Sequence, residues 1–193
     1  MADLAALIAA VRGNLTPCPP LPEGRGGTRR LYLVAGTSHL AEGWRERVSR
    51  LDLAGDPGTI DVAVREAGAA LELPVRWESP ADVIPLPAGA AERARAVPPE
   101  VAGAGGGLEI LHFDPYSVVL RLVARGDEPD YVAALEYLRR GWVDLARLET
   151  LLADVVPRFT NETLAQDPAE FRRKFRGLRQ LYARDLGEVR WIA

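Results

Sequence analysis

Residues 108–144, LEILHFDPYSVVLRLVARGDEPDYVAALEYLRRGWVD, decide the fold of this chain. The segment 108–113 is short, mostly apolar and preceded by a glycine cluster, and such a pattern is typical of a buried strand. Asp114 and Pro115 should end that strand and begin a helix, because aspartate accepts hydrogen bonds from first-turn amides and proline fits the first helical position. A glycine then ends this helix, and an acidic segment begins another. The stretch therefore predicts a strand, a helix, a tight turn and a second helix.

The motifs in this stretch resemble a known group of proteins. FDPY, then ARG, then an aspartate at the start of a helix that ends LRRGWVD is similar to the uncharacterised bacterial nucleotidyltransferase-like proteins. These proteins are relatives of the toxin–antitoxin nucleotidyltransferases, within the DNA polymerase β-like superfamily. The resemblance also includes LYLVAG at 31–36, ESPADVIPLP at 78–87 and DPAEFRRKF at 167–175, so that it covers residues 30–178. It rests on the order and spacing of the motifs and implies a minimal nucleotidyltransferase fold.

The pattern of strands and helices predicts an α/β (α+β) protein. Short apolar segments at 31–36, 49–54, 74–78 and 108–113 should form a small mixed sheet flanked by helices. We expect two parts, a nucleotidyltransferase-like core with an N-terminal helix at 1–126 and a helical C-terminal extension packed on the core at 127–193. Helical spacing of apolar residues also predicts a final long helix over 169–184.

Composition limits the possible partners and location of the chain. With 193 residues and a net charge of −3, it has no general attraction for nucleic acid or an anionic membrane. Cys18 is the only cysteine, so no internal disulfide can form and a reducing compartment is indicated. The apolar N-terminal run is too short to span a bilayer, and we expect a cytoplasmic protein. The tail, with Trp191 and Ile192, should pack on the body or on a second copy of the chain, which would make a homodimer.

The strand at 31–36 runs directly into a predicted helix over 37–48, capped by Thr37 or Ser38. A strand, a glycine and a helix present backbone amides to a phosphate in many folds. The resembled family uses Gly-Gly or Gly-Ser here to bind the triphosphate, whereas this chain has alanine at 35 before Gly36. The resemblance makes Gly36, Thr37 and Ser38 candidate nucleotide-binding residues. An ordinary capped helix explains the same residues equally well.

The strand at 49–54 aligns with the family strand that carries Asp-x-Asp. Alternate residues on a strand face the same way, so two such carboxylates can bind a pair of Mg²⁺ ions. The alignment places the first aspartate at Arg50 and the second at Asp52, which becomes the candidate catalytic residue and metal ligand. A rival alignment uses Asp61 instead, but the apolar spacing over 60–71 favours a helix there.

The replacement of one aspartate by Arg50 allows two interpretations. In the first, Asp52 is a remnant and the protein is catalytically inactive, since one carboxylate is a poor site for Mg²⁺. In the second, Arg50 binds the nucleotide phosphates directly and the metal dependence has changed. We favour the first, because charge neutralisation accounts for most of the catalysis of phosphoryl transfer.

The helix at 116–125 contains two further candidates for nucleotide binding. Family members commonly have a lysine in this helix, then Arg-Gly, then two acids that open the next helix. On our alignment the lysine position is Leu122, Arg125 is retained, and the acid positions hold Asp130 and Ala133. Arg121 could replace the missing lysine charge. The structural alternative is an Arg125–Asp130 pair that locks the turn between the helices.

The resemblance implies a nucleotidyltransferase of the toxin–antitoxin kind. If active, it would transfer NMP from a nucleoside triphosphate (NTP), with Mg²⁺, to RNA or to a protein, and its partner would be a cognate antitoxin or toxin. The altered position at Arg50 favours an impaired enzyme. The alternative is a non-catalytic binding or assembly module that retains the nucleotidyltransferase fold.

Overall fold

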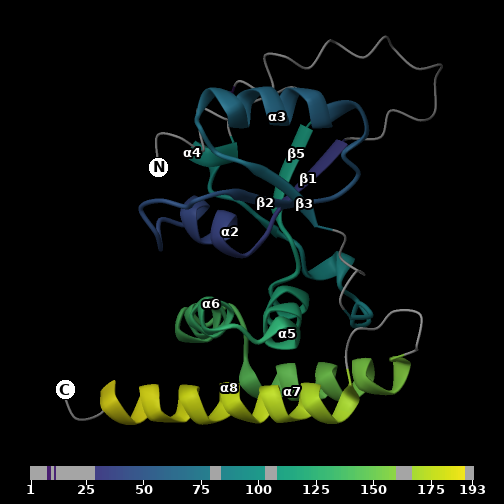
Figure 1. Ribbon diagram of the computed structural model, residues 1–193, viewed down its shortest axis with the longest axis vertical. Coiled ribbons are helices and arrows are strands. Elements are labelled where there is room, and N and C mark those ends of the chain that lie inside the picture. The colour runs from purple at the N-terminus through teal and green to yellow at the C-terminus, as the bar shows by residue number, and fades with distance from the viewer. Residues whose placement is uncertain are drawn as a thin grey trace. The chain divides into compact units, whose positions relative to one another are not determined.

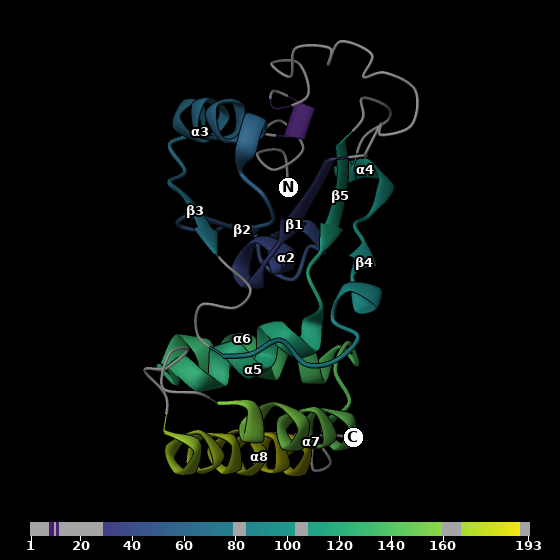
Figure 2. The same ribbon diagram turned by 90° about the vertical axis from the view of Figure 1, so that its right-hand side faces the viewer.

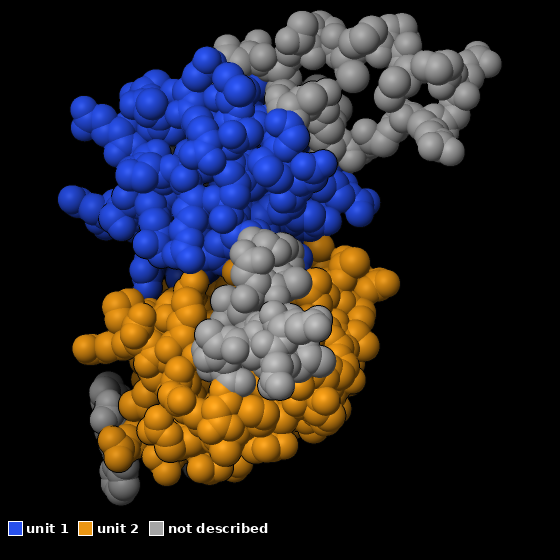
Figure 3. All heavy atoms as spheres, turned by 45° about the vertical axis from the view of Figure 1, so that its right-hand side comes forward, with its two compact units in different colours: residues 1–79, 95–113 blue, residues 80–94, 114–193 orange. Residues whose placement is uncertain are grey.

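The structure, a computed structural model, divides into two compact units that are described here separately (Figure 3). Unit 1 contains residues 1–79 and 95–113, and unit 2 contains residues 80–94 and 114–193. Within them the structure describes residues 8–9, 11, 29–78, 84–102, 108–159 and 167–189. The expectations for Cys18, Trp191 and Ile192 lie outside these residues.

Unit 1 is built on a mixed sheet (Figures 1 and 2). Its described elements are β1 (Arg29–Leu33), α2 (Ala35–Ala41), β2 (Leu51–Ala54), η1 (Gly58–Ile60), α3 (Asp61–Ala70), β3 (Val75–Glu78), β4 (Arg95–Ala96), α4 (Pro99–Ala102) and β5 (Leu108–His112). The described strands form one five-stranded sheet in the order β3-β2-β1-β5-β4. Strands β1 and β5 are parallel, as are β2 and β3, whereas β1–β2 and β4–β5 are antiparallel. The predicted α+β class is confirmed, and β4 is a strand that the sequence did not indicate.

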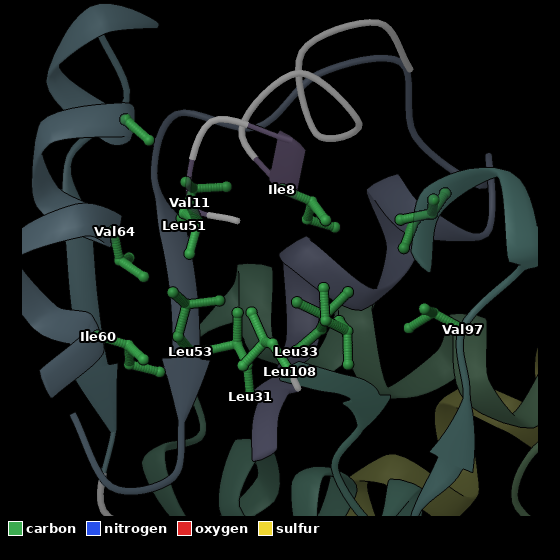
Figure 4. Packing of buried hydrophobic residues seen from close by; sticks show 14 of the residues in the cluster. Ile8, Val11, Leu31, Leu33, Leu51, Leu53, Ile60, Val64, Val97 and Leu108 are labelled. Atoms are coloured by element: carbon green, nitrogen blue, oxygen red, sulfur yellow. The ribbon is translucent and has the colours of Figure 1, made fainter. Parts of the chain in front are cut away.

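The two faces of this sheet differ in chemistry because successive side chains of a strand point to opposite sides. On one face, fully buried leucines of β1 and β2 pack with α3, which contributes Val64 and Ala67 (Figure 4). Ile8 and Val11 of the N-terminal segment belong to the same core. Each such side chain contributes about 1.5–3 kcal/mol through burial. The register places a largely polar set of side chains on the other face, namely Arg30, Tyr32, Asp52, Arg76, Glu78 and Glu109.

Helix α3 begins at Asp61, so the rival alignment that put this aspartate on a catalytic strand is wrong. The Asp61 carboxylate accepts hydrogen bonds from Arg65 Nε, at 2.8 and 2.9 Å, and from Trp77 Nε1, at 2.6 Å. It therefore links α3 to β3.

Unit 2 is helical. Its described elements are η2 (Ala91–Arg93), α5 (Pro115–Arg125), α6 (Glu128–Arg139), α7 (Leu145–Val155), η3 (Val156–Arg158) and α8 (Pro168–Val189). The predicted start of α5 is confirmed, because the Asp114 carboxylate accepts from the amides of Tyr116 and Ser117 at 3.2 and 3.3 Å. Gly126, with φ 77°, follows the helix as predicted. Helix α8 continues five residues beyond its predicted end at 184.

The boundary between the units differs from the predicted division at residue 126. Helix α5 belongs to unit 2 because it packs against α6, α7 and α8. Residues 84–94 also belong there, and Arg93 attaches them to the start of α5. Its Nε and Nη2 donate to the Asp114 carboxylate at 2.9 and 2.7 Å, and the guanidinium lies 5.8 Å from the centre of the Tyr116 ring.

Candidate functional site

The glycine turn and the acidic strand that the sequence singled out lie side by side in unit 1. The Asp52 amide donates to the Thr37 hydroxyl at 2.8 Å, and the Val34 amide donates to the Asp52 carbonyl at 3.1 Å. These bonds join the first turn of α2 to β2, which is also paired with β1. The structure thus brings Gly36, Thr37 and Asp52 into one neighbourhood through non-local hydrogen bonds.

The hydroxyls of Thr37 and Ser38 have structural roles. Both side chains are buried, and Ser38 Oγ donates to the Leu33 carbonyl at 3.0 Å. The expectation that one of them caps the helix is wrong, because α2 already begins at Ala35 and its N-cap position is Val34. The predicted helix over 37–48 is also too long.

Helix α2 ends at Ala41 for a reason that is visible in the sequence. Gly43 follows with φ 69°, and its amide donates to the Leu40 carbonyl at 3.1 Å. A glycine in this left-handed conformation is a common helix end, since it satisfies a terminal carbonyl without a Cβ penalty.

Ala35 adopts a backbone conformation that disfavours alanine. Its φ of 44° lies in the left-handed region, at the position where the resembled family has a glycine. Gly36 does not require glycine in this way, because an added Cβ would lie 3.6 Å from Val48 Cγ1 and would meet only ordinary contact. The strain at the turn is therefore located at residue 35.

Replacing Ala35 by Gly is expected to raise the free energy of unfolding by about 1 kcal/mol, because glycine enters the left-handed region without strain. Urea denaturation followed by circular dichroism measures the change. Ala69→Gly, at an exposed helical position of α3, should instead lower the free energy of unfolding by about 0.5–1 kcal/mol. Equal losses in both variants would rule out a strained residue 35.

Arg50 forms an ion pair with the carboxylate of Asp52. Arg50 Nε lies 2.9 Å from Asp52 Oδ1, and the two side chains are 47% and 11% exposed. Burial raises the pKa of the Asp52 carboxyl and the charge of Glu78 raises that pKa further, whereas the hydrogen bond and charge of Arg50 lower it. The guanidinium thus supplies a positive charge that a buried carboxylate needs.

Glu78 is a second acid at this site that the sequence reasoning missed. In the parallel pairing of β2 and β3, Asp52 is opposite Arg76 and Ala54 is opposite Glu78. Cross-strand partners share a face, so the carboxylates of Asp52 and Glu78 lie on the same side of neighbouring strands. Glu78 is only 6% exposed. The alternation of Arg76 and Glu78 in PVRWE was a local signal, but only the register connects it to Asp52.

The donor set suits a divalent cation in type but is limited in number. Carboxylate oxygens are the ligands that Mg²⁺ prefers, and Asp52 and Glu78 supply two of them. Arg50, which aligns with the first aspartate of the resembled family, is a cation that already pairs with Asp52. Over the described ranges, no group of three or more His, Cys, Asp or Glu side chains is arranged to hold a metal ion.

Arg121 and Arg125 belong to helix α5 of unit 2. Arg125 forms the predicted structural pair, with Nη2 and Nε at 2.8 and 3.2 Å from the two oxygens of Asp130. Lys174 Nζ also reinforces this turn by donating to the carbonyls of Ala124 and Arg125, at 2.7 and 3.0 Å. Arg121 is buried within the helical unit. Nucleotide binding by either arginine stays a prediction.

Comparison with protein-family models, curated proteins and solved structures finds no match to this chain. Among the helices of the described residues, none combines the length and apolar character needed to cross a membrane.

Proposed function

We propose that the protein is a nucleotidyltransferase-like protein of the toxin–antitoxin kind whose transfer of NMP from a nucleoside triphosphate is impaired. The proposal is supported above all by the hydrogen bond between the Asp52 amide and the Thr37 hydroxyl. This bond attaches a glycine-containing turn to a strand that carries a buried acid. It is the arrangement in which a phosphate chain and a metal-binding carboxylate would meet.

The side chains on the polar face of the unit 1 sheet would explain both the binding of a nucleotide and the impaired transfer of NMP. Asp52 and Glu78 would hold one Mg²⁺ ion, which neutralises charge on the transferred phosphate when bound. Gly36 lies in the turn that Thr37 joins to Asp52, where the phosphates would bind. Arg50 stands where a further carboxylate would complete a two-metal site, so the chain has the ligands for one ion but not for the pair.

The remaining parts of the proposal concern partners and location. The acceptor of NMP is RNA or a protein, and the physiological partner is a cognate antitoxin or toxin. A homodimer is also part of the proposal, and the apolar Trp191 and Ile192 in the tail sequence support it, because a second copy could cover them. A cytoplasmic location is also part of the proposal, and the single cysteine supports it because thiols are kept reduced there.

One observation favours a second function, a non-catalytic binding module. The 2.9 Å contact between Arg50 and Asp52 satisfies the candidate metal ligand internally. A site whose carboxylate is already paired in this way would bind no metal. The protein would then retain the fold only as a scaffold for binding or assembly.

Titration of ATP, CTP, GTP and UTP by calorimetry, with excess Mg²⁺ and with EDTA, tests the proposal. We expect Mg²⁺ to increase nucleotide affinity, and Asp52→Asn and Glu78→Gln to abolish this increase by weakening metal binding at least about tenfold. Transfer of labelled NMP to the chain or to RNA should be slow and should be lost in the same variants. Glu66→Gln, on the exposed side of α3, is the control and should change neither result.

Absence of nucleotide binding under every condition would contradict the proposed function and support the non-catalytic module. A Mg²⁺ effect that persists in both Asp52→Asn and Glu78→Gln would place the nucleotide elsewhere and would also contradict the proposal.

A further inference from the structure

Two arginines flank the buried acids on the polar face of unit 1. Arg50 precedes β2 by one residue and reaches Asp52 with its Nε atom. Arg76 is directly opposite Asp52 in the pairing of β2 with β3, so its side chain leaves the sheet on the same side. Burial raises the pKa of the Asp52 carboxyl, and Arg76 is close enough for its charge to oppose this rise. Two cations and two carboxylates therefore share a small area.

Both arginines have N–H donors that are not used in hydrogen bonds to the described residues. A guanidinium carries five N–H donors in a fixed fork, and Arg50 uses only its Nε within the described part of the chain. Its side chain is 47% exposed, so the terminal nitrogens face solvent. Arg76 is exposed, and the described residues provide it with no hydrogen-bond partner. Among the described residues, no acceptor of these free donors would have to be displaced by a ligand that approaches both arginines.

The acids favour this use of the arginines. Asp52 is held by its backbone in β2, and its carboxylate fixes the direction of the Arg50 guanidinium through the 2.9 Å contact. A guanidinium that is already oriented loses less side-chain entropy when it binds a second acceptor.

We propose that this cluster binds the polyphosphate of a nucleotide without a divalent metal ion, with Arg50 and Arg76 as the donors and Asp52 as the residue that orients Arg50. This inference rests on the proposed function, since that function brings a nucleotide to the face. Arginine is suited to the task because its parallel N–H groups match two phosphate oxygens. Nucleotide binding then does not require the metal. Mg²⁺ only increases the affinity, whereas transfer cannot proceed without it.

The test is calorimetric titration of ATP and of inorganic tripolyphosphate in EDTA. The wild-type chain should bind both ligands. Arg50→Ala and Arg76→Ala should each weaken binding about 10- to 100-fold, as expected for loss of charge-assisted hydrogen bonds. Arg50→Lys retains the charge without the fork and should bind with intermediate affinity. Arg65→Ala removes an exposed arginine from α3 and should leave binding unchanged.

Two further readouts keep the result interpretable if Arg50→Ala unfolds. Arg76→Ala breaks no ion pair within the described residues, so it tests the site without disturbing Asp52. Asp52→Asn should retain binding in EDTA, because the amide oxygen of asparagine can still accept from Arg50 Nε and orient it, although the variant abolishes the Mg²⁺ effect. Circular dichroism confirms that each variant is folded.

Different outcomes separate the inference from the proposed function. Binding by the wild-type chain that requires Mg²⁺ would overturn the metal-independent mode and leave the proposed function intact. Equal affinity of the wild-type chain, Arg50→Ala and Arg76→Ala in EDTA would also overturn it. Failure to bind any nucleotide, with or without Mg²⁺, would remove both proposals together.

Discussion

Replacing Arg93 by Ala is expected to lower the free energy of unfolding by about 3–5 kcal/mol, because it leaves a buried aspartate without its counter-ion. Asp114 is fully buried, and Arg93 donates to both of its oxygens. The same aspartate accepts from Ser117 Oγ at 2.6 Å and caps α5. Urea denaturation measures the loss. Hydrogen exchange should also become faster at the α5 amides before it does elsewhere in unit 2.

A matched control separates burial from geometry. Arg139 contacts both oxygens of Asp185, at 2.7 and 2.6 Å, but these side chains are 43% and 21% exposed. Such a pair contributes at most about 1 kcal/mol in water, so Arg139→Ala should have a small effect. If both variants lose the same free energy, the attachment of residues 84–94 to α5 does not depend on the buried pair.

Local rules explain which parts of the fold were predicted. The start of α5 depends on Asp114 and Pro115, and its end depends on Gly126, all within a few residues of the backbone groups that they satisfy. The four predicted strands were recognisable for the same reason, since apolar runs bounded by turn residues are a local feature. The predicted Arg125–Asp130 pair also joins neighbours in sequence.

Non-local pairing explains what was missed. Glu78 becomes part of the candidate site only because β3 pairs with β2 in parallel and in one particular register. The alternation of side chains along a strand predicts which residues share a face, but it does not predict which strands are neighbours. The place of residues 84–94 in unit 2 depends on an Arg93–Asp114 contact across 21 positions. The left-handed backbone of Ala35 is missed for a different reason, because residues other than glycine seldom adopt a positive φ.

Replacing Arg50 by Asp is expected to increase Mg²⁺-dependent NMP transfer at saturating nucleotide by at least about 100-fold, by analogy with the effect of single charge-stabilising groups in phosphoryl and acyl transfer. The change removes the cation that occupies Asp52 and adds a carboxylate two residues away on the same side of the strand. Together with Glu78, three acids would then lie on one face of the two neighbouring strands. Release of labelled pyrophosphate from each nucleoside triphosphate measures the gain.

Arg50→Asn is the control, since it removes the guanidinium without adding a ligand. It should free Asp52 but raise transfer far less than Arg50→Asp. A second readout needs no catalysis. Without metal, two close carboxylates repel, so Arg50→Asp should be less stable than Arg50→Asn, and Mg²⁺ should raise its melting temperature selectively because binding stabilises the folded state. If Mg²⁺ stabilises neither variant, Asp52 and Glu78 do not form a metal site, and the impaired transfer proposed here cannot be attributed to Arg50.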